Sequence, residues 1–195
     1  MSAGTWTTAF LAAHIGELWR VEDSFYIEFV TAYQKVDIGR RNADIGIRSD
    51  RPTEAGLAGK KIGEVAHAIY SGRKLVNGVA AGLFVGVTGE GANVKSARWL
   101  MAHHGDRTGV SGNDTRSVRD LVASGAGLSV FPCFAGDDDP ALVRVAPPIA
   151  ELRAEQWLVM HNEERHHRPV RDVAGRITTL LRAHAPLFRG ERPRS

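Results

Sequence analysis

Few residues of this sequence have the types and the spacing that catalysis or metal binding requires. Asp44 lies in an apolar run, ADIGIR, but no histidine, serine or second carboxylate is spaced with it for general acid–base work. His161, His166 and His167 offer nitrogen ligands, yet they form no HxxxH pair, and the chain has a single cysteine, Cys133. The sequence therefore predicts neither a catalytic centre nor a metal site.

Two further features with possible chemistry have simpler structural explanations. The glycine-rich stretch GVTGEG at 86–91 lacks the lysine-serine/threonine ending of a phosphate loop and does not complete GxGxxG, so we expect turns there. Cys133 follows Pro132 at the end of an apolar run and has no second cysteine to resolve a disulfide. We expect a buried, unreactive thiol and no cofactor.

Composition bounds the class of protein. The 195 residues are 43% hydrophobic, enough for a substantial core, and 25 Lys and Arg against 22 Asp and Glu give a net charge of only +3. The basic residues are scattered, apart from RHHRPVR at 165–171 and the tail RGERPRS at 189–195, both of which we expect to be solvated surface. This distribution does not predict a nucleic-acid surface.

The N-terminus and the hydropathy pattern indicate a cytoplasmic protein without membrane insertion. The first residues have no basic region, and His14 and Glu17 interrupt their apolar pattern, so they do not form a signal peptide. No apolar stretch approaches the roughly 20 residues that span a membrane. A lone cysteine is also typical of a reducing compartment.

Helical and strand-like patterns alternate along the chain, which predicts an α/β fold with a parallel sheet. In the first part we expect a helix over 7–20 with Thr7 or Thr8 as its cap, a strand over 24–30, a short helix over 36–41, and strands over 43–48 and 60–71. In the second part we expect strands at 83–87, 107–112, 127–132, 142–147 and 156–161, and helices at 92–102, at 113–125 and from Pro169 onward.

No linker rich in proline, glycine or serine separates these two α/β parts. A chain that crosses from one part to the other and later returns would explain the missing boundary. The crossings would lie near 66–71 and 157–161, and a ligand would bind between the two lobes.

Four stretches, taken in order, carry a family resemblance: VDIGRRNADIGIRSDRP, KKIGEVAHAIYS, VASGAGLSVFPCFAGDDDPALVRVAPPI and WLVMHNEERHHRPVRDVAGRITTLLR. Together they resemble the effector-binding domain of LysR-type transcriptional regulators over roughly residues 7–185. The resemblance implies a periplasmic-binding-protein-like (type 2) fold of two α/β lobes joined by two crossover strands. Lobe I would comprise 1–67 and 160–195, and lobe II 68–159. It also implies a non-enzymatic domain that binds a small effector and forms homodimers or tetramers.

This sequence departs from the family pattern at its start. Such regulators begin with a winged helix-turn-helix and a linker helix, for which we find no counterpart here, and the first strand of lobe I is truncated to at most MSAGT. Within the family, contact with DNA would then be made only through a helix-turn-helix domain not present in this sequence.

The candidate effector-binding residues follow the expected strands. Helix N-termini and hydroxyl groups at these positions favour binding of a carboxylate or phosphate group. The candidate residues are Thr31, Tyr33, Gln34, Arg48, Ser71, Ser111, Asn113 and Phe131. Each has a structural alternative: Thr31 and Asn113 could cap helices, Ser71 could serve a turn, and Phe131 could fill the core. We expect a small, anionic effector, with Tyr33 or Phe131 covering its apolar part.

Other interpretations remain open from the sequence. The faces of helices 7–20 and 92–102 are candidate dimer surfaces by resemblance, but they could simply pack on the sheets. A solute-binding protein of a transport system would share the fold but would need an export signal. A small α/β enzyme would need an activated nucleophile or metal centre, which we cannot assemble from these residues.

Overall fold

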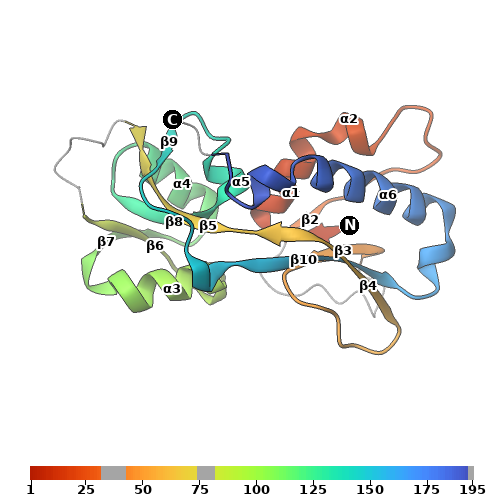
Figure 1. Ribbon diagram of the computed structural model, residues 1–195, viewed down its shortest axis with the longest axis horizontal. Helices are drawn as coiled ribbons and strands as arrows, with labels where there is room; N and C mark the ends of the chain where they lie inside the picture. The colour runs from red at the N-terminus through yellow and green to blue at the C-terminus, as the bar shows by residue number, and fades with distance from the viewer. Residues whose placement is uncertain (32–42, 74–81, 193–195) are drawn as a thin grey trace. The chain divides into compact units, whose positions relative to one another are not determined.

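The computed structural model describes residues 1–31, 43–73 and 82–192, and it divides the chain into two compact units (Figure 1). Unit 1 comprises residues 1–64 and 154–185, and unit 2 comprises residues 65–153 and 186–195. Each unit contains its own five-stranded sheet. The α/β class and the two-lobed architecture expected from the sequence are confirmed.

The sheet of unit 1 is mixed rather than parallel. Its order is β2 (Val30–Thr31), β1 (Ser2–Ala3), β3 (Ile45–Arg48), β10 (Ala154–His161) and β4 (Leu57–Val65). Strand β1 runs parallel to β2 and β3, whereas β10 pairs with β3 in the antiparallel direction. The predicted parallel sheet is therefore wrong for the strand that returns late in the sequence.

The first predicted helix is divided in the structure. It begins earlier than expected, with Gly4 as its N-cap in place of a threonine, and forms α1 (Thr5–Ala13) and the short α2 (Ile15–Leu18). His14 separates them with a non-helical backbone (φ −110°, ψ 27°), and its Nδ1 lies 2.8 Å from the carbonyl oxygen of Phe10. The late helix α6 (Arg168–Ala183) largely has the predicted amphipathic pattern. Its apolar residues at 173, 177, 180 and 181 are buried, whereas Val170, also predicted to face inward, is only partly buried.

The predicted strand over 24–30 is wrong except at its last residue. The backbone instead turns at 20–23, where the amide of Arg20 donates to the carboxylate of Asp23 over 2.8 Å. The indole of Trp19 then donates to the carbonyl oxygen of Phe25, a backbone group that a strand would use for pairing. The short helix predicted over 36–41 lies outside the described residues.

The sheet of unit 2 has the order β7 (Thr108–Gly112), β6 (Phe84–Val87), β8 (Leu128–Pro132), β5 (His67–Gly72) and β9 (Leu142–Arg144). Strand β6 runs parallel to β7 and β8, while β5 is antiparallel to β8 and β9. Strands β6, β7, β8 and β9 lie within the stretches that the sequence predicted. The stretch predicted as strand over 60–71 is divided between β4 in the first sheet and β5 in the second. As in unit 1, the strands that come from a chain crossing break the parallel pattern.

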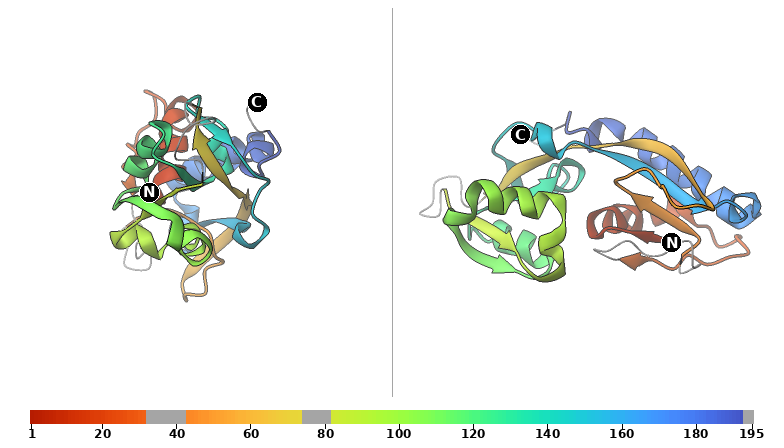
Figure 2. Two further views of the ribbon diagram at one scale, coloured as in Figure 1. Left: turned by 90° about the vertical axis from the view of Figure 1, so that its left-hand side faces the viewer. Right: turned by 90° about the horizontal axis from the view of Figure 1, so that it is seen from below.

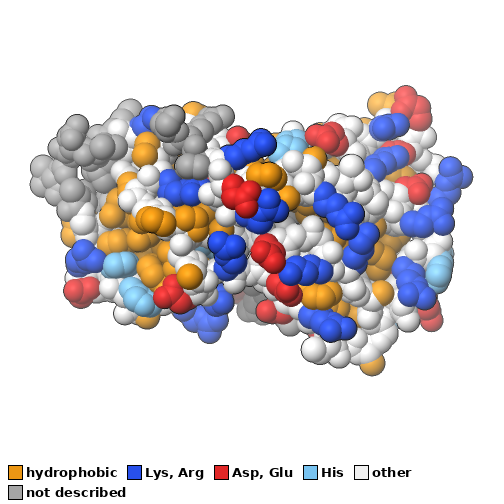
Figure 3. All heavy atoms as spheres, viewed as in Figure 1, with side chains coloured by type: hydrophobic (Ala, Val, Ile, Leu, Met, Phe, Trp, Pro, Cys, Tyr) orange, Lys and Arg blue, Asp and Glu red, His pale blue; other side chains and the backbone are white. Residues whose placement is uncertain are grey.

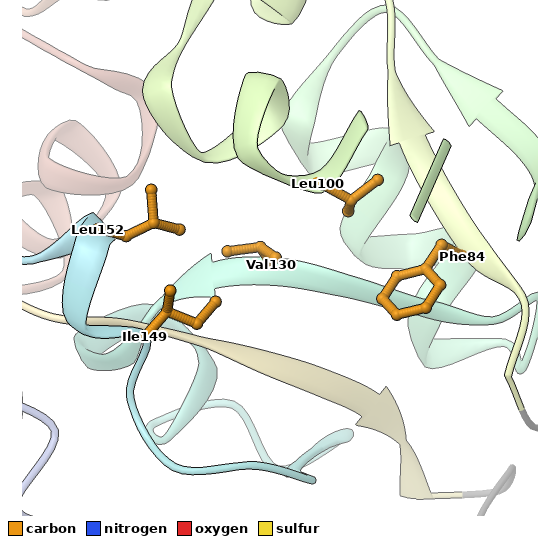
Figure 4. Close-up of a cluster of buried hydrophobic side chains, with 5 residues drawn as sticks. All are labelled: Phe84, Leu100, Val130, Ile149 and Leu152. Carbon is orange, nitrogen blue, oxygen red and sulfur yellow. The ribbon is translucent and has the colours of Figure 1, made fainter. Parts of the chain in front are cut away.

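Helices cover both faces of the second sheet (Figures 1 and 2). On one face, α3 (Lys95–His104) contributes to a buried cluster, shown in Figure 4, of Phe84, Leu100, Val130, Ile149 and Leu152. On the other face lie α4 (Thr115–Ala123), whose backbone approaches β5 closely at Gly72, and α5 (Cys133–Gly136), which packs on Tyr70. Burying these apolar side chains supplies the main stabilisation of the unit.

Short 3₁₀ helices connect several of these elements. They are η2 (Gly89–Asn93), η3 (Gly105–Arg107), η4 (Ala150–Leu152) and η5 (Glu164–His166). The first occupies the glycine-rich stretch, where Gly89 has a positive φ of 61°, in agreement with the predicted turns.

The last described residues, 186–192, pack within unit 2. After α7 (Ala185–Phe188), the ring of Phe188 stacks on Phe134 with ring centroids 4.1 Å apart, and the amide of Ala66 donates to the carbonyl oxygen of Phe188. Arg144 donates to the carbonyl oxygen of Gly190 over 2.8 Å. The chain thus passes between the units after residues 64, 153 and 185. The lobe boundaries predicted from the sequence, after residues 67 and 159, lie three and six residues later than the unit boundaries after 64 and 153. The prediction also assigns residues 186–195 to lobe I.

No helix among the described residues is long and apolar enough to cross a membrane.

Candidate ligand-binding site

Three parallel strands of unit 1 end at the same edge of its sheet. Ala3 of β1 pairs with Thr31 of β2, and Ser2 pairs with Gly46 of β3. Arg48 therefore lies one residue beyond the level of Ala3, beside the entry to α1. The register brings together the predicted residues Thr31 and Arg48 at the carboxyl ends of the strands, where open α/β sheets bind ligands.

The N-terminus of α1 lies at this edge and is a further candidate beyond the residues predicted from the sequence. Gly4 is its N-cap, and no side chain there accepts a hydrogen bond from the first turn of the helix. Amide groups at such a position, together with the helix dipole, favour an anion. The sequence does indicate this helix N-terminus, because Gly4 immediately precedes an apolar helical pattern. The predicted helix, however, begins at residue 7, two residues after the observed start.

Arg48 already has an acidic partner in the structure. Its guanidinium donates to the carboxylate of Glu54 over 3.1 Å, and its side chain is only 10% exposed. This ion pair reduces the positive charge that Arg48 offers to an anion. Tyr33 and Gln34, which were predicted to lie nearby, are outside the described residues.

The parallel strands of unit 2 also share a carboxyl edge. Val87 pairs with Gly112, and Phe84 pairs with Leu128, so Phe131 lies level with Val87. This register brings together the predicted residues Ser111, Asn113 and Phe131. Ser111 and Asn113 are exposed, whereas Phe131 is 2% exposed and packs beside the ring of Tyr70 at 6.1 Å between centroids.

Two further polar residues occupy this edge of unit 2 and were not predicted. Thr88 follows β6, is exposed, and donates its amide to the carbonyl oxygen of Gly112 over 2.8 Å. His67 begins β5 and pairs with Pro132, which places it at the same end of the sheet. Nothing in the local sequence distinguished His67, because its position depends on the antiparallel pairing of a distant strand.

His67 is held in its neutral form. Burial lowers the pKa of its imidazole to about 4, although the hydrogen bond between its Nδ1 and the carbonyl oxygen of Leu152, at 3.1 Å, opposes the shift. The neutral ring can donate from Nδ1 to that carbonyl, while Nε2 remains an acceptor. A partly buried histidine that is held neutral suits hydrogen bonding better than ion pairing with an anion.

Ser71 lies apart from the other candidates in unit 2. It pairs with Leu128, the first residue of β8, and therefore lies at the opposite end of the sheet from Phe131. Its side chain is buried, and its hydroxyl donates to the carbonyl oxygen of Gly72 over 2.9 Å. In this structure Ser71 satisfies a local hydrogen bond.

The N-terminus of α4 is capped by an acidic side chain. The carboxylate of Asp114 accepts hydrogen bonds from the amide of Ser117 at 2.9 Å and from its hydroxyl at 3.2 Å. The sequence predicts Asn113 or Asp114 as the N-cap of this helix, and Asp114 is the cap in the structure. An anion approaching the start of α4 would meet a like charge, so unit 1 offers the more favourable helix N-terminus.

No group of three or more His, Cys, Asp or Glu side chains within 1–31, 43–73 and 82–192 is arranged to hold a metal ion. Cys133 is fully buried, as predicted, and burial raises the pKa of its thiol, which disfavours the reactive thiolate.

Comparison with known structures supports the fold at low sequence identity. The regulatory domain of CrgA, a LysR-type transcriptional regulator from Neisseria meningitidis, is 13% identical, with a TM-score of 0.66 over 92% of this chain and 96% of that chain. The reduced OxyR regulatory domain from Pseudomonas aeruginosa is 17% identical, with a TM-score of 0.68 over 91% and 95%. The CcmR regulatory domain from Synechocystis PCC6803, in complex with 2-PG, is 13% identical, with a TM-score of 0.67 over 92% and 94%.

No curated protein matches the sequence. The sequence model of the LysR substrate binding domain matches residues 5–182, which is most of the chain. The chain therefore belongs to the LysR substrate-binding domain family.

Proposed function

We propose that this chain is the effector-sensing and oligomerisation domain of a LysR-type transcriptional regulator, and that its effector is a small carboxylate or phosphate compound. The observation that carries the proposal is the family match over residues 5–182, joined to polar residues at the carboxyl edges of both sheets. The ligand named in the CcmR structure, 2-PG, is a precedent for effector binding among the structural neighbours.

The regulatory part of the proposal rests on differential binding. An effector controls DNA binding only if it binds one arrangement of the regulator more tightly than the other. DNA itself would be contacted by a helix-turn-helix domain joined to this one. No catalytic residue is assigned. The protein would act in the cytoplasm, where the regulated DNA lies.

A calorimetric screen of organic acids and phosphate esters tests the effector. We expect at least one compound to bind, and Thr31→Ala in unit 1 and Asn113→Ala in unit 2 to weaken that binding. Substitution of Ser71 serves as the control, because its hydroxyl is buried and bonded locally. If no anionic compound binds to the folded wild-type protein, the effector class is refuted.

Arg48 gives a sharper test of the charge of the effector. If Arg48 contacts an anionic effector, Glu54 competes for the same guanidinium, so Glu54→Gln should tighten binding and Arg48→Gln should weaken it. Glu64→Gln is the matched control, because Glu64 forms an exposed ion pair with Lys61 elsewhere in unit 1. Equal effects of Glu54→Gln and Glu64→Gln would contradict a direct role for Arg48.

We propose further that the protein forms homodimers or tetramers through the faces of α1–α2 and α3. Exposed apolar side chains support this assignment: Ile15 on α2 is 39% exposed and Met101 on α3 is 47% exposed. Sedimentation of Ile15→Glu and Met101→Glu should show smaller assemblies than the wild type. Val21→Glu, at a more exposed apolar residue outside both helices, should leave the assembly unchanged.

The comparisons do not favour the alternative of a solute-binding protein for transport, because the family match and the structural neighbours cited above are regulator domains.

A further inference from the structure

A groove on unit 1 lies away from the strand ends described above. It runs between α2 with its following loop and the middle of α6, two segments about 150 residues apart in sequence, and its volume is about 620 Å³. That volume is in the range of small-molecule sites. In Figure 3, basic side chains follow the surface where Figure 1 places α6.

Some charges of this groove are already neutralised within unit 1. Arg176 donates two hydrogen bonds to the carboxylate of Asp23 and a third to the carbonyl oxygen of Leu18, which ties α6 to the loop after α2. Arg176 holds the pKa of Asp23 at about 2, so the pair stays ionised at neutral pH. Asp172, on the α6 wall, lies 3.7 Å from the guanidinium of Arg168, which is outside the groove.

Two arginines of the lining have no such partner. Among the residues that the structure describes, no ion pair or side-chain hydrogen bond engages the guanidinium of Arg20, in the turn after α2, or that of Arg171, on α6. Glu17 is the one acidic residue of the described lining with no ion pair to another described residue. The charge of Arg20 also helps to lower the pKa of Asp23, although that carboxylate is already paired with Arg176. Arg20 and Arg171 therefore leave positive charge on opposite walls of the groove, opposed by Glu17.

Two glycines keep the groove open. A Cβ atom added to Gly16 on α2 or Gly175 on α6 would meet no atom within 4 Å. Neither glycine has the positive φ that would exclude other residues. Glycine in the middle of a helix is less stable than alanine, and no packing contact in the structure compensates for it at Gly175. Space for a ligand would explain why both walls lack side chains at these positions.

We propose that this groove is a second binding site, distinct from the effector site, for a small organic anion with carboxylate or phosphate groups. Arg20 and Arg171 hold the anionic groups from opposite walls, and Gly16 and Gly175 provide the room for the body of the ligand. Charge-assisted hydrogen bonds from a planar guanidinium favour carboxylate and phosphate. Glu17 weakens the binding of a purely anionic ligand, and it sets a preference for ligands that place a hydroxyl or amine on its side.

Calorimetric titration with inorganic pyrophosphate and with citrate, at one fixed low ionic strength, tests this site. We expect Arg20→Gln and Arg171→Gln each to weaken binding by about fivefold, which is modest because the groove is open to solvent. Glu17→Gln should tighten binding, because it removes a like charge. Arg182→Gln is the matched control: it removes the same charge from the same helix outside the groove, and it should have no effect.

A steric variant separates the groove from general electrostatics. Gly175→Leu places a side chain in the groove without changing charge, so it should abolish pyrophosphate binding, while Gly175→Ala should preserve most of it. Unchanged far-UV circular dichroism and melting temperature establish that the variants are folded.

Several results would overturn the proposal. One is binding that depends equally on Arg182 and Arg171, which indicates general attraction to a basic surface. Another is a complete lack of binding by both probes to the folded wild type. Tight binding of a 20-base-pair DNA duplex that depends on Arg20 and Arg171 would instead assign the groove to nucleic acid. Asn113→Ala should leave the pyrophosphate and citrate titrations unchanged even where it weakens effector binding. The proposal for the effector site and the proposal for the groove can therefore be refuted separately.

Discussion

Acidification should destabilise unit 2 through His67. The imidazole of His67 has a pKa of about 4 in the folded protein against 6.5 for the exposed group, because burial penalises its charged form. As the pH falls, His67 therefore binds a proton at a higher pH in the unfolded state than in the folded state. The stabilising contribution of neutral His67 is complete above pH 6.5 and is lost as the pH falls toward 4.

The size of the effect follows from the change in pKa. At about 1.4 kcal/mol per pKa unit, the difference between 6.5 and about 4 corresponds to about 3 kcal/mol of unfolding free energy. This figure is an upper value, since the residue is only partly buried and its ring retains some contact with solvent. Much of the 5–15 kcal/mol that typically stabilises a domain would remain.

Urea denaturation at several pH values between 7 and 4 measures this contribution by comparison of the wild type with His67→Gln. Glutamine can keep a hydrogen bond to the carbonyl oxygen of Leu152 but does not titrate, so the variant should lose less stability on acidification. His103→Gln is the control, because His103 is exposed and its Nδ1 lies 2.8 Å from the carbonyl oxygen of Trp99. We expect its pH profile to run parallel to that of the wild type.

An NMR titration of the imidazole protons gives the pKa of His67 directly. A value near 6.5, or parallel stability profiles for the wild type and His67→Gln, would refute the reasoning.

Three substitutions test other contacts by equilibrium denaturation. Asp137→Asn should cost about 3–5 kcal/mol, because Asp137 and Arg144 form a buried ion pair and the guanidinium would keep its charge without its carboxylate; the exposed Asp106→Asn should change stability by less than about 0.5 kcal/mol. Phe188→Ala should cost about 3–5 kcal/mol, because it empties a fully buried site between the C-terminal segment and α5; an effect below about 1 kcal/mol would show that this segment does not stabilise unit 2. Asp114→Ala should cost about 1 kcal/mol by removing the cap of α4, and no change would mean that solvent replaces the hydrogen bonds of Asp114.

The sequence alone predicted those elements whose formation depends on capping residues and on the spacing of nearby apolar residues. Asp114 as the cap, the apolar spacing of α4 and Gly125 after its end, with φ 98°, were sufficient to predict that helix. The apolar runs that became β6 and β8 were equally clear, because each is buried and bounded by turn residues. The four sequence stretches, taken in order, were sufficient to predict the family to which the chain belongs.

Tertiary contacts decided the elements that local patterns mispredicted. Residues 24–29 have strand-forming side chains, but Arg176 of the distant helix α6 binds the carboxylate of Asp23 and the carbonyl oxygen of Leu18, and these contacts hold the preceding segment in a turn. The direction of β5 and β10 depends on strands distant in sequence, so the mixed sheets could not be derived from alternation of helices and strands.

The same distinction applies to the candidate sites. The sequence predicts Thr31, Arg48, Ser111 and Asn113 as candidates because polar residues after apolar strands carry a local signal. Strand register then placed Ser71 at the far end of its sheet and brought His67 to the carboxyl edge, which no local pattern records. The arginine-lined groove depends on the packing of α2 against α6, across more than 150 residues of sequence. Pairings between distant segments are fixed only when the whole chain minimises its exposed apolar surface, and therefore only the folded structure shows them.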